Sequence, residues 1–382
     1  MTIFFTIITA ALVFGAVVLV HELGHFLAAR RCGICVEEFS IGFGPTVFCR
    51  QKNGTRYTLR LLPLGGYNML SGMEPQTDEG EPESETDGTA VKNGPMMHCR
   101  REQDCDRRGR ETVFPVVLNG KTYPEASPWQ RFFVLACGAL MNFLLGFILL
   151  LVLTSSESVL STKTIYDFSE KAASHTSGLE SGDEILAVNG RSCFVIEDVF
   201  YELQRTDNMT ADFTVLREGR LVSVPDVRFD TVVDDAGNTT MKVDFRVYGM
   251  RRTPINVTRQ SLARFAYYAR SILRSFMDLF AGRVGINQLS GPVGVVSAVS
   301  QAVQYGWQDV FSLAALITIN LGIFNLLPIP GLDGFKMLFL VIEGIAGREV
   351  PQKIQNAVNA AGMVLLLWLM LFITMQDIGR LF

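Results

Sequence analysis

The feature that most constrains this chain is a set of four regions that each contain a long, uncharged apolar run. A helix needs about 20 apolar residues to cross a bilayer, and each run has roughly that length. The four regions are residues 1–30, 132–154, 307–345 and 355–376. Charged residues make up only 19% of the 382 residues, below the level of about 25% that is usual in soluble domains. The sequence therefore predicts an α-helical multi-pass membrane protein with four transmembrane helices.

Basic residues beside the apolar runs predict how these helices are oriented. They are Arg30, Arg31, Arg131, Lys336, Arg348 and Lys353. Because Lys and Arg accumulate in short cytoplasmic loops, we expect residues 30–131 inside the cell and residues 154–306 outside. The first and third runs then both cross from outside to inside, which brings their carboxyl-terminal ends to the same side of the membrane.

Between the first two transmembrane helices we expect a β-hairpin and then a charged loop. Residues 31–73 contain two strand-rich stretches joined at Asn53-Gly54, a dipeptide typical of tight hairpin turns. We interpret this region as a membrane-associated β-hairpin. Residues 74–131 are predicted to be a charged cytosolic loop. Seven acidic residues lie within residues 74–87, a composition typical of disorder.

Outside the membrane we expect one folded domain and one amphipathic helix. Residues 160–250 contain strand patterns with Gly182-Asp183 before a strand and Asn189-Gly190 after it. This pattern resembles a PDZ-like α+β domain, which binds peptide ends by adding a strand to its sheet. Residues 255–306 are predicted to hold an amphipathic surface helix, which serves as a membrane anchor or a gate for substrates, followed by a Gly-Pro-Val-Gly segment.

Charge and cysteine content argue against two other classes. A formal net charge of −4 is not that of a nucleic-acid-binding protein. The seven cysteines are scattered, and the pair Cys32 and Cys35 has no second pair at the spacing of a four-ligand zinc site. We expect them to be free thiols that face a reducing cytosol.

The first apolar run ends in His21-Glu22-Leu23-Gly24-His25, an H-E-x-x-H motif. Positions i and i+4 share one face of a helix, so both imidazoles can bind one metal ion. Zinc lowers the pKa of bound water to near 7, and a neighbouring Glu22 carboxylate can take its proton. Polar groups at such a depth are costly, which favours a metal site over a polar network without metal.

A catalytic zinc needs a third protein ligand, and Asp333 is the candidate. It follows Pro328 and Pro330 at the inner end of the third apolar run. Because the first and third runs have the same orientation, the motifs at their inner ends lie at a similar depth. The prolines break the helix there and free the backbone to turn. The alternative is that Asp333 only caps the start of a helix.

The two motifs together resemble the site-2 protease family of intramembrane zinc metalloproteases. The resemblance rests on HELGH near the amino terminus and on N-x-x-P-x-P-x-L-D-G over residues 325–334. It implies that His21, His25 and Asp333 bind Zn²⁺ and that Glu22 is the catalytic base. It also implies that Asn325 helps to bind substrate.

A single PDZ-like domain, the FSIGFGP and LPLGGY segments, and LSGPVG resemble the bacterial branch of this family. That branch lies in the bacterial cytoplasmic membrane and cleaves anti-sigma factors and signal-peptide remnants. The resemblance implies that the hairpin pairs with unwound substrate. Ala139 and Phe335 depart from the common pattern of relatives, but neither departure removes a ligand.

The combined interpretation is an intramembrane zinc metalloendopeptidase with single-span membrane proteins as substrates, membrane lipid as its surroundings and no nucleic-acid partner. Two other hypotheses fit parts of the pattern. A metal transporter needs polar residues along a path through the membrane, and acidic residues are nearly absent from the apolar runs. A scaffold that lacks proteolytic activity does not need Glu22. Zinc and cleavage assays separate all three.

The expected topology is open to a direct test. A reporter inserted within residues 76–90 should be cytosolic, and one within residues 230–240 should be extracytoplasmic, because Lys and Arg flank the inner ends of the helices. Compartment-specific reporter activity in intact cells measures both positions. Both reporters on the same side of the membrane would overturn the arrangement that brings His21, His25 and Asp333 to one depth.

Overall fold

The computed structural model describes residues 2–73, 98–105, 111–118, 120–206, 209–233, 239–283, 285, 290–348 and 350–379. It divides into two compact units, which we call the first and second units. Residues 1–146 and 284–382 form the first unit, and residues 147–283 form the second.

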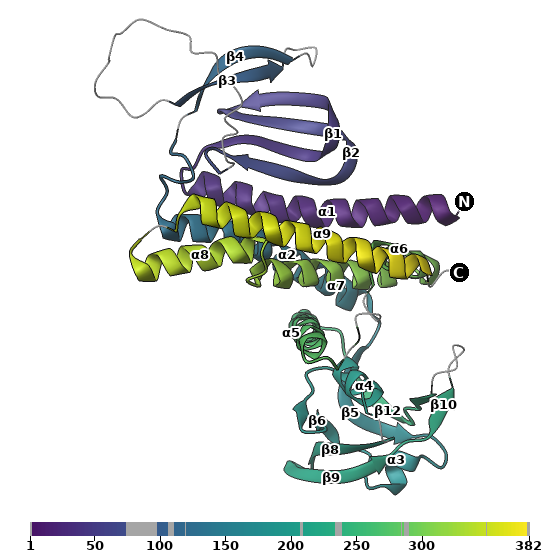
Figure 1. Cartoon of the computed structure of the whole chain (residues 1–382). Helices are drawn as coiled ribbons and strands as arrows, with labels where there is room; N and C mark the ends of the chain where they lie inside the picture. The colour runs from purple at the N-terminus through teal and green to yellow at the C-terminus, as the bar shows by residue number, and fades with distance from the viewer. Residues whose placement is uncertain are drawn as a thin grey trace, which may run out of the picture. The chain divides into compact units, whose positions relative to one another are not determined.

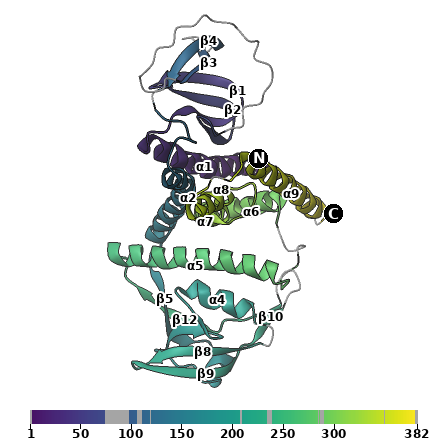
Figure 2. The same cartoon turned by 60° about the vertical axis from the view of Figure 1, so that its left-hand side comes forward.

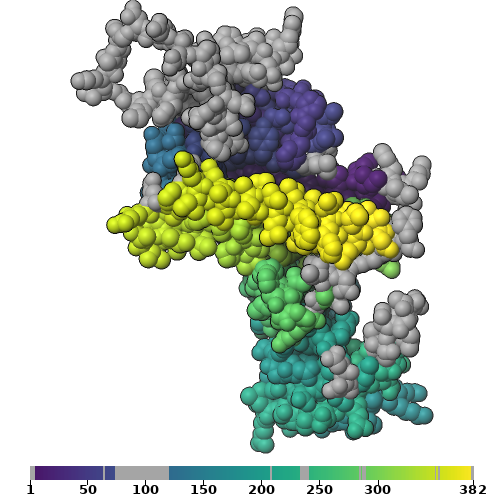
Figure 3. Space-filling model, in the orientation of Figure 1, coloured from purple at the N-terminus to yellow at the C-terminus, as the bar shows by residue number. Residues whose placement is uncertain are grey.

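Four helices of the described chain are long and apolar enough to cross a membrane, which agrees in number with the four expected transmembrane helices. They are α1 (Thr2–Arg31), α2 (Pro128–Ser156), α7 (Trp307–Leu326) and α9 (Gln352–Gly379). In the first unit, α1 contacts α7, and α6 (Pro292–Tyr305) contacts α1, α7 and α9. Figure 1 shows α1, α7 and α9 extending in the same direction across the view. The outer face of α9, yellow in Figure 3, is apolar, with Leu365, Trp368 and Leu371 each more than 60% exposed. Such a surface is stable against hydrocarbon rather than water.

The region expected to hold the third transmembrane helix, residues 307–345, contains two helices. The span α7 ends at Leu326, and α8 (Asp333–Ala346) begins after a non-helical segment, residues 327–332. Pro328 and Pro330 lie in this segment and have no N–H to continue a helical ladder. The third apolar run is therefore divided at the prolines, as the sequence pattern predicts.

The non-helical segment is held by a neighbouring span. The Gly331 N–H donates to Oδ1 of Asn359 on α9, at 3.1 Å. This bond satisfies a backbone donor that no helical carbonyl reaches at the break. The break therefore places Asp333 at the first position of α8, with the backbone just before it fixed by α9.

Glycines allow the helices of the first unit to approach closely. A Cβ added to Gly24 on α1 would lie 2.3 Å from the carbonyl oxygen of Cys137 on α2. One added to Gly322 on α7 would lie 2.5 Å from the Phe143 ring on α2. Close backbone approach of this kind is how helices associate without a hydrophobic driving force between them. The short helix α6 (Pro292–Tyr305) packs on the same group of helices.

The expected hairpin is a larger sheet than the sequence indicated. Strands β1 (Val36–Lys52) and β2 (Thr55–Leu70) are long and bent, so residues 38–41 pair with residues 56–59 on one side and with residues 66–69 on the other. The LPLGGY segment is thus part of β2. Among the described strands, none pairs with the outer edge of residues 66–70.

Part of the predicted charged loop, residues 74–131, is a strand pair, so the expectation of a loop is wrong there. Strands β3 (His98–Cys105) and β4 (Glu111–Leu118) pair antiparallel. The loop is predicted from the many charged residues of this region. However, residues 113–118 are Val-Phe-Pro-Val-Val-Leu, which is rich in strand-forming residues. The acidic stretch, residues 74–87, lies outside the described residues.

The second unit is an α+β fold with a six-stranded sheet in the order β12-β5-β6-β8-β9, with β7 paired to β6. Its strands are β5 (Leu160–Phe168), β6 (Glu184–Val188), β7 (Arg191–Ser192), β8 (Thr210–Arg217), β9 (Arg220–Arg228), β10 (Thr231–Val233), β11 (Thr239–Met241) and β12 (Phe245–Met250). Its helices are α3 (Ala173–Thr176), α4 (Ile196–Gln204) and α5 (Pro254–Phe280). Figure 2 shows α5 beside α4.

The core of the second unit forms where the sequence pattern predicts buried strands. Ile185, Phe213 and Val227 are fully buried in one cluster. The Asn189-Gly190 turn has positive φ at both residues, which Asn and Gly adopt at little cost. The strand order is compatible with the PDZ-like interpretation, which stays a prediction.

Cysteine chemistry differs from the expectation at one position. Cys32, Cys35, Cys137 and Cys193 are free, but Cys49 is disulfide-bonded, so the expectation that all thiols are free is wrong. The sequence argument rested on the redox compartment, whereas a bond also depends on whether the fold brings two thiols together. Burial raises the pKa of the Cys193 thiol to about 12, so this cysteine is not a reactive thiolate.

Candidate metal centre

Helix α1 carries His21 and His25 on one face, one helical turn apart. Their side chains are buried, with 7% and 8% of each residue exposed. The two Nε2 atoms lie 3.1 Å apart. The i, i+4 spacing of the motif therefore brings both imidazoles to one point, as the helical period requires.

Asp333, 308 residues beyond His25 in the sequence, completes the group. Its Oδ2 lies 3.1 Å from Nε2 of His21 and 3.0 Å from Nε2 of His25. Tetrahedral zinc with bonds of about 2.0–2.1 Å places its ligand atoms about 3.3 Å apart. The three atoms thus form a triangle close to one face of such a tetrahedron, and a small expansion suffices for the ion.

The partners of Nδ1 in the two imidazoles leave the Nε2 atoms free to bind a metal. Nδ1 of His25 lies 2.9 Å from the carbonyl oxygen of Val134, so this nitrogen donates and Nε2 keeps its lone pair. Nδ1 of His21 lies 3.4 Å from the amide nitrogen of Asn142, whose Oδ1 is buried without a partner. When the Asn142 amide is turned by 180°, its oxygen and nitrogen exchange places, and the oxygen accepts a hydrogen bond from Nδ1–H of His21. Such outer partners orient metal-binding histidines.

Gly138 on α2 makes room for both imidazoles. A Cβ at this position would lie 2.5 Å from Cε1 of His25 and 2.8 Å from Cε1 of His21. These separations are shorter than carbon atoms reach without a shift of one partner. The absence of a side chain at Gly138 is therefore a condition for the observed arrangement.

A cavity of about 620 Å³ opens beside the cluster. Glu22, His25 and Asp333 line one part of it, and residues 68–70 of β2 line another. The amide nitrogen and oxygen of Asn68 are both buried and have no hydrogen-bond partner. Residues 68–70, whose outer side pairs with no described strand, therefore line the same cavity as the candidate metal ligands.

The structure brings together four of the five residues that the sequence singled out. His21, His25, Asp333 and Glu22 meet in one place. Asn325 is buried in the last turn of α7 but is not among the residues that line the cavity.

Three residues of the site had no role in the sequence argument. They are Gly138, Asn142 and Asn68. The Gly-Ala-x-x-Asn pattern of the second apolar run carried a signal for the first two. Asn68 lies in the LGGYNML stretch, which departs from the common pattern of relatives, but its place in the cavity depends on the bend of β2.

The chain is similar to known zinc metalloproteases. The family model described as Peptidase family M50 matches residues 9–369. The chain is 30% identical to the zinc metalloprotease RasP of Geobacillus kaustophilus, with 99% of this chain and 98% of that protein covered. It is 30% identical to the regulator of sigma-W protease RasP of Bacillus subtilis, with 99% of each covered. A putative zinc metalloprotease of Fusobacterium nucleatum is 32% identical, also with 99% of each covered.

The Gly138 contact predicts a selective loss of metal. Gly138→Ala should lower the zinc content and the proteolytic activity, because the added methyl group displaces both imidazoles. Gly344→Ala on α8 is the matched control, since a Cβ there meets nothing within 4 Å. A helical Gly→Ala change otherwise favours the helix by about 1 kcal/mol. Zinc analysis of the two purified variants tests this, and equal zinc content in both would contradict the steric argument.

Proposed function

This chain belongs to peptidase family M50, the site-2 protease family, and we propose that this zinc metalloprotease hydrolyses peptide bonds within transmembrane segments of single-span membrane proteins. The observation that carries the proposal is the convergence of three metal-binding atoms and Glu22 on one cavity among apolar helices. The family and its curated relatives support the protease chemistry. The four apolar helices support a multi-pass membrane protein, and we infer that it lies in the bacterial cytoplasmic membrane.

In this proposal His21, His25 and Asp333 bind the zinc ion and Glu22 is the general base. A zinc ion supplies Lewis-acid chemistry, which polarises a carbonyl group and lowers the pKa of water. Glu22 lines the cavity beside His25, where its carboxylate takes a proton from the attacking water. The same carboxyl group then delivers that proton to the nitrogen of the departing amine.

A transmembrane substrate must lose helical structure before its carbonyl groups can be attacked. We infer that the unwound segment pairs with the outer edge of residues 66–70, which replaces its lost backbone hydrogen bonds. The buried amide of Asn68 offers a further donor and acceptor at this edge. Asn325, which does not line the cavity, stays a predicted substrate-binding residue.

The relatives suggest the class of substrate. One is named regulator of sigma-W protease. We infer that the substrates of this chain include membrane-bound regulators such as anti-sigma factors, with signal-peptide remnants as a second class. A transporter would leave the intact Glu22 beside the histidines without a purpose, and so would a scaffold that lacks proteolytic activity.

Two variants separate the proposed roles at the cavity. Glu22→Gln should keep its zinc and lose cleavage by at least about 100-fold, because general-base catalysis contributes about that much. Asp333→Asn should lose both, since a neutral amide is a poorer zinc ligand than a carboxylate. Zinc analysis and cleavage of a single-span substrate measure the two effects. Zinc loss in folded Glu22→Gln, or full zinc and turnover in Asp333→Asn, would refute the assignment.

We propose that the predicted PDZ-like domain, residues 160–250, restricts which substrates reach the cavity. Leu160 and Met250 are paired neighbours on β5 and β12, so residues 160–250 can be replaced by a short Gly-Ser linker. We expect this deletion to raise cleavage of substrates with a large ectodomain and to leave shortened substrates nearly unaffected. Cleavage rates of both substrates, with zinc content as the control, test the filter. Equal loss on both substrates would show that the domain serves stability instead.

A further inference from the structure

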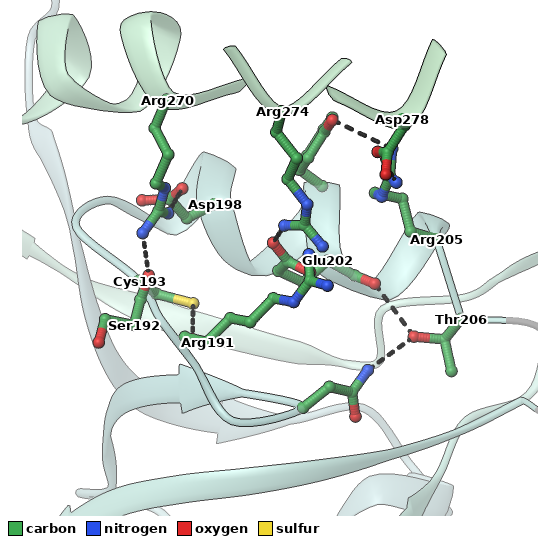
Figure 4. Close-up of polar contacts among 12 residues, drawn as sticks. Arg191, Ser192, Cys193, Asp198, Glu202, Arg205, Thr206, Arg270, Arg274 and Asp278 are labelled. Carbon is green, nitrogen blue, oxygen red and sulfur yellow. Dashed lines mark hydrogen bonds and ion pairs between the residues drawn. The ribbon is translucent and has the colours of Figure 1, made fainter. Parts of the chain in front are cut away.

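Helix α5 is joined to α4 of the second unit by ion pairs. Figure 4 shows Arg270 and Arg274 reaching from α5 to Asp198 and Glu202. In the opposite direction, Arg205 from the end of α4 pairs with Asp278 on α5. The charged side of α5 therefore faces the protein.

Another face of α5 carries exposed apolar residues toward both ends of the helix, with the exposed Arg259 among them. Its exposed apolar residues are Ile255, Leu262, Leu273, Met277 and Phe280. Successive spacings of 7, 11, 4 and 3 residues place them on one face of the helix.

The start of α5 contacts the end of a transmembrane span. The Arg264 guanidinium donates to the hydroxyl of Thr154 on α2, at 3.0 Å. The Ser261 hydroxyl, which donates to the Val257 carbonyl, lies 3.4 Å from the carbonyl oxygen of Leu150. Leu150 lies in the last turns of the transmembrane span α2. The amino-terminal half of α5 therefore packs against the carboxyl-terminal end of α2.

A cavity of about 660 Å³ lies at the border between the two sides of α5. Its polar lining consists of Arg191, Arg270, Arg274, Arg283 and Asp278. Its apolar lining consists of Leu273, Met277 and Ala281. One wall is therefore cationic, and the other continues into the exposed apolar face.

The cluster of charges around this cavity has an excess of positive charge. Five guanidinium groups (Arg191, Arg205, Arg270, Arg274 and Arg283) stand against three carboxylates (Asp198, Glu202 and Asp278), an excess of two. The three carboxylate side chains are no more than 4% exposed. Arg191 and Arg283 are 45% and 69% exposed, and their ion pairs are long, at 3.9 and 3.4 Å. These two guanidinium groups can bind a further anion without breaking the contacts between α4 and α5.

We propose that this cavity binds the phosphate of an anionic phospholipid, whose acyl chains lie along the apolar face of α5. Guanidinium groups bind phosphate oxygens in a bidentate manner. A soluble anion would use the arginines but would leave Leu273, Met277 and Phe280 exposed. A phospholipid satisfies both walls of the cavity, and binding holds the second unit at the membrane surface through one specific site.

The test compares two double variants of the full chain in phosphatidylcholine nanodiscs with increasing phosphatidylglycerol. Arg191→Gln/Arg283→Gln removes the two open charges of the cavity. Arg220→Gln/Arg246→Gln removes two charges from β9 and β12, outside the cavity. Each basic residue near an anionic surface contributes about 1 kcal/mol, so the cavity variant should bind phosphatidylglycerol on the order of 30-fold more weakly. Native mass spectrometry of the bound lipid measures this, and the control should match the unaltered chain.

Two further measurements separate loss of charge from loss of folding, and lipid binding from binding of a soluble phosphate. Arg191→Lys/Arg283→Lys keeps the charge and should retain most of the binding, which separates lost charge from lost folding. sn-Glycerol 3-phosphate carries the phosphate without acyl chains and should bind far more weakly than phosphatidylglycerol. Equal lipid binding by the cavity and control variants would overturn the proposal, as would equal affinity for the soluble phosphate and the lipid.

Discussion

The packing of the first unit depends on holding three lone pairs close to one point. They belong to Nε2 of His21, Nε2 of His25 and Oδ2 of Asp333, and their separations of 3.0–3.1 Å suit a single cation. Polar atoms among apolar helices are costly unless they are paired. The arrangement needs Gly138 for space and the Val134 carbonyl for orientation, so α2 is as much a part of the site as α1.

Two stretches of non-helical backbone lie beside this cluster. Asp333 follows the broken segment between α7 and α8, and residues 68–70 of β2 line the adjoining cavity. Irregular backbone at membrane depth is tolerated where it is buried in protein or lines a cavity. These departures from regular helix supply a ligand and leave a strand edge open, and the proposed mechanism uses both.

The two units are stabilised in different ways. Close helix contacts at glycines hold the first unit, whereas the second has a hydrophobic core around Phe213. Ion pairs then join α5 to this core through carboxylates that are almost fully buried, such as Asp198. Breaking one partner of such a pair leaves a buried charge, which is strongly destabilising. The polar side of α5 is therefore committed to the protein, which leaves its apolar side available to the membrane.

Local patterns in the sequence determined the four apolar helices, the turn at Asn189-Gly190 and the shared face of His21 and His25. Each depends on residues only a few positions apart, for which helical and strand periods are sufficient. The matching orientation of the first and third runs made Asp333 the candidate third ligand. Only the tertiary structure decided the role of Gly138, the free edge at Asn68 and the arginine-lined cavity on α5. These features arise where segments far apart in the chain come into contact, and no local period encodes such contacts.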